Sequence, residues 1–140
     1  MLTGCVDQSA PAASASERAS PSSKASSAAP AKPTFRPTGT AADNLAYFNF
    51  VNTAFLAPDP TPGGRRIIDN LVAAGFDKKA MQVTSDTTTL GRDVDSTQFS
   101  VRFGSSCLVG SASASGYVGV VGPAVSGVLC LLGTTRAIDW

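Results

Sequence analysis

The feature that most restricts how this chain can fold is an alternation of apolar and polar residues that ends at a cluster of small residues. Phe99, Val101 and Phe103 alternate with polar neighbours over residues 96–103, and Gly104 opens a break of glycine and serine. Period-two alternation before a small-residue turn predicts a β-hairpin with one buried face and one solvated face. The segments that precede the hairpin must then supply the layer that covers its buried face.

The length of the turn decides which face of the hairpin Cys107 occupies. A two-residue turn would place Cys107 opposite Arg102 on the solvated face, whereas a three-residue turn would place it opposite Phe103. We favour the three-residue turn because it puts Cys107 and Val109 on the face of Phe103. That arrangement buries the apolar residues of both strands together.

A first helix is expected directly before the prolines at positions 58 and 60. Apolar residues recur at spacings of three and four from Leu45 to Phe55, which is the pattern of an amphipathic helix. Thr40 and Asp43 have capping-box spacing at its start. Proline at positions 58 and 60 ends the helix near Leu56.

A second helix is expected between Pro62 and a terminating Gly75, with Thr61 as its N-cap. Arg65 and Arg66 fall near its N-terminal end, where the helix dipole favours an anion. We treat the two arginines as a candidate anion site, and an ordinary solvated helix face is the alternative interpretation.

The C-terminal third has an unusual composition, because residues 104–135 contain no charged side chain and residues 117–132 are mostly apolar. A helix of the latter length would span about 24 Å, short of a hydrocarbon core of about 30 Å. Valine-rich sequence punctuated by glycine favours buried strands, at residues 117–121 and 128–132 around a Gly-Pro turn. A membrane-embedded segment stays open as the alternative.

The fold class that follows is α+β. Two N-terminal helices would pack on one face of a small, mainly antiparallel sheet of three to five strands. A short strand is expected at residues 81–84, and the polar connection over residues 85–95 would be anchored by Leu90. Trp140, the only tryptophan, is expected to dock on the domain by its ring.

The N-terminal part is a different kind of sequence. Residues 6–39 consist largely of Ala, Ser and Pro, and such a segment buries too little apolar surface to offset the entropy lost on ordering. We therefore divide the chain into residues 1–5, a disordered tether over residues 6–39 and a globular domain over residues 40–140. A tether of this length would span roughly 30–35 Å.

The residue inventory restricts the chemistry. The chain has no histidine, and its only glutamate, Glu17, lies in the tether. Imidazole-based zinc sites, catalytic triads that need histidine and glutamate general bases are therefore unavailable. Acidic and basic side chains are nearly balanced in the globular part, so no nucleic-acid surface is expected.

No metal site and no cofactor are expected. Asp93 and Asp95 faintly resemble the opening of a calcium loop, but Gln98 stands where the turn glycine of such a loop belongs. The glycines at positions 116, 119 and 122 form no phosphate-binding loop, because no P-loop lysine follows them, and their spacing is wrong for the dinucleotide-binding fingerprint.

Cys107 and Cys130 are the only cysteines of the globular part, an even number consistent with export to an oxidising space. We predict a structural disulfide between them. Two buried thiols and a redox pair are the alternatives, and the absence of a C-x-x-C motif argues against the redox pair.

The first five residues, Met1-Leu-Thr-Gly-Cys5, look like a bacterial lipobox, in which the cysteine carries a diacylglyceryl group. Cys5 is therefore the expected lipidation site, and two acyl chains there would hold the domain at a bilayer surface. Neither the charged segment nor the apolar segment of a signal peptide precedes the motif, so we expect these segments to be encoded upstream. A chance match at a cytosolic N-terminus is the alternative.

Taken with the lipobox and the tether, residues 70–84 (NLVAAGFDKKAMQVT), 98–103 (QFSVRF) and 107–110 (CLVG) resemble the small actinobacterial lipoproteins that carry a domain of unknown function. The resemblance covers residues 40–140. It implies a cell-envelope location, on the outer face of the cytoplasmic membrane, and it implies no known activity or site residues.

The leading interpretation is a binding or structural module of the envelope, without catalytic activity. It would be attached to the membrane through a lipid on Cys5, with an unidentified protein or cell-wall partner and no nucleic acid. The alternative from another class is a hydrolase-type enzyme that uses Asp or Ser without His.

Overall fold

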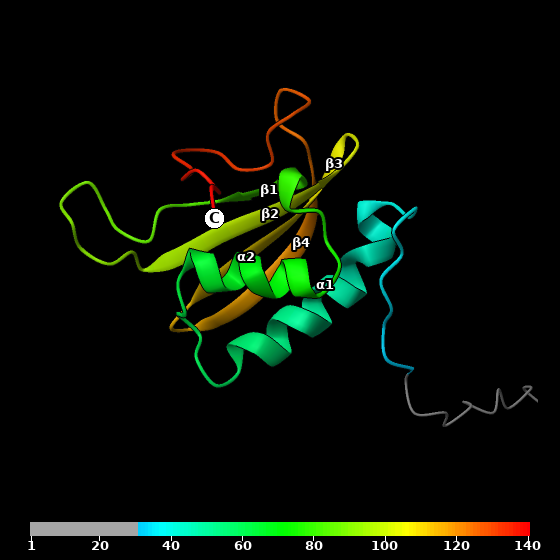
Figure 1. The fold of residues 1–140 in the computed structure, drawn as a ribbon, viewed down its shortest axis with the longest axis horizontal. Helices are drawn as coiled ribbons and strands as arrows, with labels where there is room; N and C mark the ends of the chain where they lie inside the picture. The colour runs from blue at the N-terminus through cyan, green and yellow to red at the C-terminus, as the bar shows by residue number, and fades with distance from the viewer. Residues whose placement is uncertain (1–30) are drawn as a thin grey trace, which may run out of the picture. The chain divides into compact units, whose positions relative to one another are not determined.

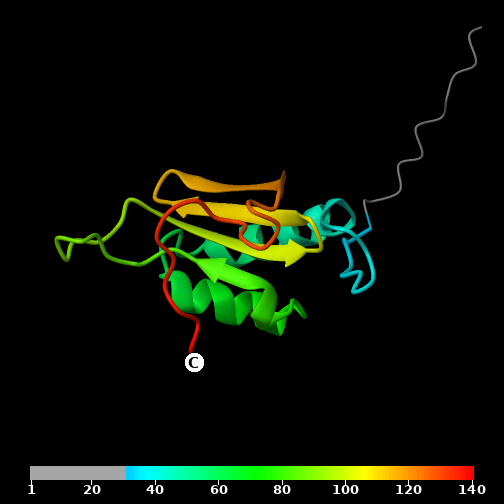
Figure 2. The ribbon, with the colours of Figure 1, turned by 90° about the horizontal axis from the view of Figure 1, so that it is seen from above.

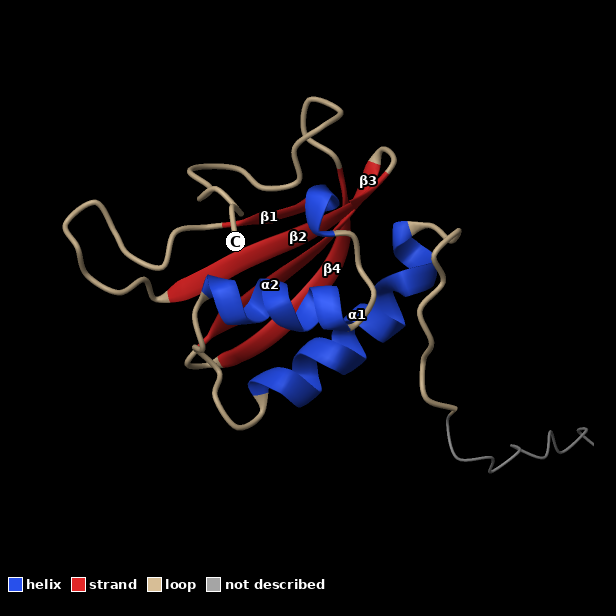
Figure 3. Cartoon of the chain, in the orientation of Figure 1, coloured by secondary structure: helices blue, strands red, loops and turns tan. Residues whose placement is uncertain are grey.

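The computed structural model describes residues 31–140. The elements are α1 (Ala41–Leu56), α2 (Gly64–Ala73), the short 3-10 helix η1 (Lys78–Ala80), β1 (Met81–Val83), β2 (Ser96–Phe103), β3 (Ser106–Ser113) and β4 (Gly116–Pro123). The strands form one antiparallel sheet in the order β1-β2-β3-β4, and α1 and α2 lie against one of its faces (Figure 1 and Figure 3). The predicted α+β architecture is confirmed. Cys5 and most of the predicted tether lie outside the described residues.

The first helix begins where its capping box predicts. The Thr40 hydroxyl accepts a hydrogen bond from the Asp43 N–H at 3.2 Å, and the Asp43 carboxylate accepts one from the Thr40 N–H at 2.8 Å. Phe48 and Leu56 of α1 are buried. Phe35, which composition alone placed in the tether, packs its ring against Phe76 with 4.8 Å between ring centroids.

The capping box makes part of the stability depend on pH. Hydrogen bonds from the Thr40 backbone and then from its hydroxyl lower the pKa of Asp43 below its ordinary value of 3.8. Because the folded-state pKa is the lower one, the stabilisation is complete above the unfolded pKa and is lost as the pH falls through the folded one. We therefore expect the difference in melting temperature between wild type and Asp43→Asn to shrink as the pH falls from about 6 to about 3. Circular dichroism melts measure it, and a difference that stays constant over this range would contradict the assignment.

The second helix begins at Gly64, two residues later than the predicted Pro62. Gly63 precedes it with a φ of +89°, a backbone conformation that favours glycine. The cap is the carboxylate of Asp86, which accepts a hydrogen bond from the Gly64 N–H at 2.6 Å. The helix ends as predicted, before Gly75 with a φ of +101°.

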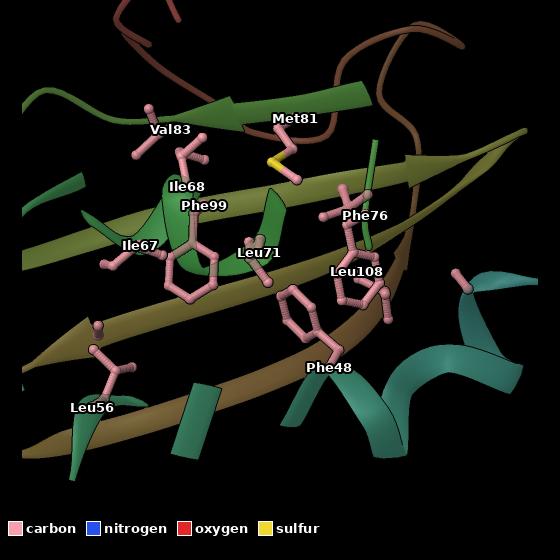
Figure 4. Close-up of a cluster of buried hydrophobic side chains, with 13 residues drawn as sticks. Phe48, Leu56, Ile67, Ile68, Leu71, Phe76, Met81, Val83, Phe99 and Leu108 are labelled. Carbon is pink, nitrogen blue, oxygen red and sulfur yellow. The ribbon is translucent and has the colours of Figure 1, made fainter. Parts of the chain in front are cut away.

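The core lies between the two helices and the inner face of the sheet. Its fully buried large apolar residues are Val101 and, labelled in Figure 4, Phe48, Ile67, Ile68, Leu71, Val83, Phe99 and Leu108. Phe99 lies near the centre, with its ring centroid 5.8 Å from that of Phe48 and 6.2 Å from that of Tyr117. Gly110 pairs with Phe99, and a β carbon at position 110 would lie 2.5 Å from the Phe99 ring. Glycine is therefore needed there for the ring to lie against β3.

The turn between β2 and β3 has two residues, so the preferred three-residue turn is wrong. Arg102 pairs with Cys107, and Gly104 has a φ of +61° at the first central position of a tight hairpin turn. Leu108, in place of Cys107, faces the helices. Cys107 is nevertheless fully buried, because the loop after β4 covers the outer face of the sheet at that point.

Two further expectations in the C-terminal half need correction. The strand expected at residues 117–121 is present as β4. Residues 128–132, however, form no strand and belong to a loop that contains a single bridge between Val125 and Leu129. Ser126 and Gly127 have positive φ values of 52° and 76°, which break an extended backbone. Leu90, the expected anchor, is 83 % exposed. Within residues 31–140, no helix combines the length and the apolar character needed to cross a membrane.

Candidate interaction surface

The outer face of the sheet, opposite the helices, is partly covered by the loop that follows β4. A disulfide joins Cys107 of β3 to Cys130 of this loop, which is the pairing that the sequence predicts. The side-chain oxygen of Gln82 accepts hydrogen bonds from the backbone N–H groups of Cys130 at 2.6 Å and Leu131 at 3.3 Å. Ser100 is fully buried on this face. The disulfide and Gln82 thus hold the loop in one place on the sheet.

The chain end closes the β1 edge of the sheet. The backbone N–H of Arg136 donates to the carbonyl oxygen of Val83 at 2.9 Å, and Thr135 forms an antiparallel bridge with Thr84. Figure 2 shows the last residues, in red, running past β1 toward α2. The backbone at Val83 and Thr84, on this edge of the sheet, therefore has a partner within the chain.

Trp140 docks on α2 through its ring, as expected from the sequence. Its indole N–H donates to the Asp69 carboxylate at 2.9 Å. The cationic groups of Arg65, Lys78 and Arg136 lie 5.4, 5.3 and 5.0 Å from the ring centroid, within the range of cation–π attraction. These contacts fix the chain end that closes the β1 edge.

The opposite edge, at β4, is open among the described residues, since β4 has β3 as its one neighbouring strand. Ser113 pairs with Gly116 across a two-residue turn, and the pair next to such a turn is hydrogen-bonded. Alternate residues of β4, beginning with Gly116, therefore bond to β3. The residues between them, Tyr117, Gly119 and Val121, direct their backbone N–H and C=O groups toward the open edge.

Exposed apolar side chains gather in β4 and in the loop after it. They are Val118, Val120, Val121, Val128, Leu129 and Leu132, and they are 38–77 % exposed. Scattered exposed valines are ordinary on protein surfaces, but this set comes from a run of sequence without one charged residue. We call β4 and residues 124–132 together the uncharged surface.

Polar contacts with α1 hold β4 from the inner side. The Tyr117 hydroxyl donates to the side-chain oxygen of Asn49 at 2.8 Å, and the side-chain amide of Asn52 lies 3.4 Å from the same hydroxyl. Burial raises the pKa of Tyr117, so the phenol keeps its proton and its role as donor at neutral pH. A β carbon at Gly119 would collide with Asn49 and Tyr117, so this glycine allows the close approach of α1 and β4.

The candidate anion site at Arg65 and Arg66 stays a prediction. The guanidinium of Arg66 lies 3.0 Å from the Asp59 carboxylate, and that of Arg65 lies 4.0 Å from the Asp69 carboxylate. The first backbone N–H of α2 binds Asp86. An external anion would therefore compete with carboxylates of the chain itself.

An open cavity of about 470 Å³ is lined by Asp86, Asp93 and Asp95. The Asp86 carboxylate is already paired with the guanidinium of Arg136 at 2.6 Å, besides its hydrogen bond to α2. Asp93 and Asp95 are exposed in the loop before β2, whereas an acid–base pair of carboxyls usually works from a desolvated position. Within residues 31–140, no group of three or more His, Cys, Asp or Glu residues is placed to hold a metal ion.

Two helices on one face of a four-stranded antiparallel sheet, with a loop bonded to the other face, define a small disulfide-containing α+β domain. This is consistent with a small extracellular module, and the disulfide suggests an extracytoplasmic location. Residues 52–134 match the family described as a domain of unknown function (DUF6993). The match covers more than half of the chain, so the chain belongs to this family. Comparisons with curated proteins and with solved structures gave no match.

Proposed function

We propose that this protein is a lipid-anchored module of the bacterial cell envelope that binds a protein partner through the uncharged surface. The observation that carries the proposal is the coincidence of exposed apolar side chains with an open strand edge in a run of sequence without charge. Protein contact sites have this character, because apolar side chains and unpaired backbone groups both gain from a partner. The carboxylates of the acidic cavity, in contrast, are exposed or already paired.

The proposed anchor is a lipid on Cys5. Its support is the lipobox-like start of the sequence, the composition of residues 6–39, and a disulfide whose formation needs an oxidising compartment. A flexible tether of this length would keep the domain within roughly 30–35 Å of the bilayer. The domain could then meet partners in the envelope while attached to the outer face of the cytoplasmic membrane.

Lipid labelling in bacteria tests the anchor. The full gene with its upstream region is expressed in the native host with an alkyne fatty acid, and cells are separated into membrane and soluble fractions. We expect the wild type to be labelled and membrane-bound, and Cys5→Ala to lose the label and at least about nine-tenths of its membrane association. Ser9→Ala, in the tether, is the matched control and should behave as the wild type. Label retained by Cys5→Ala, or a wild type found unlabelled in the soluble fraction, would refute the anchor.

A further inference from the structure

We infer that the open edge of β4 pairs with β4 of a second copy of this chain, which joins two sheets into one continuous antiparallel sheet across a two-fold axis. The inference deepens the proposed function, on which it rests for the use of the uncharged surface, because it names the partner. A strand that pairs with its own copy across a two-fold axis is necessarily antiparallel, which matches the rest of this sheet.

β4 lacks the features that usually protect an edge strand. Edge strands are normally short, charged, bulged or covered. β4 pairs with β3 over eight consecutive residues without a bulge, it carries no charged residue, and its one proline, Pro123, stands at its end. The β1 edge, in contrast, is closed by the chain end at residues 135–136.

The free backbone groups of β4 are spaced so that they can pair with those of a second copy. Tyr117, Gly119 and Val121 direct N–H and C=O outward, and they are symmetric about Gly119. If Gly119 lies on the two-fold axis, Gly119 pairs with its own copy and Tyr117 pairs with Val121 of the second copy. Each N–H and C=O group of these three residues then meets a complementary group, giving about six new backbone hydrogen bonds.

This register also brings apolar side chains of the two copies together. Val118 of each copy would lie opposite Val120 of the other on the outer face of the sheet. Both pairs are of the non-hydrogen-bonded type, in which the two residues lie closest together. These two valines are 63 % and 49 % exposed in the single chain, and pairing would bury them against β-branched partners, which is favourable. On the inner face, the side chains that lie over Gly119 are those of Asn49 and Tyr117, which carry no charge.

The absence of charge on β4 also favours pairing between two copies. A two-fold contact sets each surface against itself, so any charge on it meets a like charge, and like charges in a contact oppose binding. The nearest charged residues in the sequence on either side of the uncharged run are Arg102 and Arg136. A surface without charge is compatible with itself, whereas it offers a charged partner nothing to complement.

The mass of the protein in solution tests the dimer. The full chain with Cys5→Ser, which removes the lipidated thiol, is measured by sedimentation equilibrium. We expect a dimer of about 28 kDa from a chain of 14.2 kDa, and at least tenfold weaker association for Val118→Lys, with circular dichroism showing that the variant is folded. Leu90→Lys makes the same change of charge at a residue that is 83 % exposed in the loop before β2, outside the uncharged surface, and it should associate as the wild type does. A wild type that is monomeric at about 1 mM would overturn the inference.

Charge pairing tests the register. In the register centred on Gly119, residue 118 of one copy faces residue 120 of the other. A mixture of Val118→Lys and Val120→Glu chains should therefore form a mixed dimer at least tenfold more tightly than Val118→Lys pairs with itself. If the mixed dimer forms no more tightly than Val118→Lys pairs with itself, this register is wrong.

Photo-crosslinking in cells separates failure of the dimer from failure of the proposed function. A photoreactive residue is placed at position 118, with position 90, in the exposed loop before β2, as the control. An adduct of twice the chain mass from position 118 supports the dimer. An adduct with a different protein overturns the dimer and leaves the proposed function standing, and absence of any adduct specific to position 118 overturns both.

Discussion

Replacing Phe99 with alanine is expected to remove about 3–5 kcal/mol from the free energy of unfolding, the largest loss we expect from a single substitution. The ring is fully buried, and it contacts Phe48 of α1 and Tyr117 of β4. Its removal leaves a cavity at the point where both layers of the fold meet, and the surrounding side chains can fill only part of it. Urea denaturation followed by circular dichroism measures the change.

The control for this substitution is Leu90→Ala. Leu90 is 83 % exposed in the loop before β2, so its truncation should change the free energy of unfolding by less than about 0.5 kcal/mol. A loss below about 1 kcal/mol for Phe99→Ala, or a similar loss for both variants, would show that Phe99 does not hold the two layers together.

Removing the disulfide, by replacing Cys107 and Cys130 with alanine, is expected to cost about 3 kcal/mol of unfolding free energy. The two cysteines are separated by 23 residues in the sequence, and the cross-link restricts the unfolded chain over that loop. The alanine variant should also lose protection from hydrogen exchange on the outer face of the sheet, because the disulfide holds the loop that covers Ser100. Hydrogen exchange should therefore speed up first at the β2 and β3 amides beneath this loop.

Reduced wild-type protein is the comparison for the alanine variant. Reduction removes the cross-link but keeps both buried sulfur atoms, so it should account for most of the loss. Equal unfolding midpoints for oxidised, reduced and alanine-substituted protein would mean that the cross-link does not stabilise the fold.

The layers of this fold could be predicted because their signals are local. The apolar stripe from Leu45 to Phe55 predicts α1, and the Thr40–Asp43 capping box places its first residue correctly. The alternation of Phe99, Val101 and Phe103 predicts which face of β2 is buried against the helices. These patterns need no knowledge of how distant segments pack.

The turn of the hairpin could not be predicted from apolar content, because both faces of the sheet are covered in part. Cys107 is apolar and fully buried, yet it lies on the outer face beneath a loop that is attached to it by Cys130. A buried apolar residue on a strand therefore does not mark the helix-covered face. The same loop accounts for the wrong strand at residues 128–132, where Cys130 and Leu131 are buried although the segment does not join the sheet.

Features of the candidate surface depend on contacts far apart in the sequence. Asp86 caps α2 from 22 residues away, and no local pattern marks it as a cap. The open edge of β4 follows from the order of the strands, which the sequence pattern did not reveal. The absence of charge between residues 104 and 135 was the one available signal, and it indicated strands without indicating which of them lies at an edge.

The closed edge at β1 has a consequence for how far self-assembly can go. Because Arg136 and Thr135 occupy that edge, each copy offers one strand for lateral addition, and two copies use both. Growth is then saturated at the pair and does not run on into a fibril, even at a high local concentration of the protein. Deleting the last residues, and with them the contacts of Trp140, would free a second growing end.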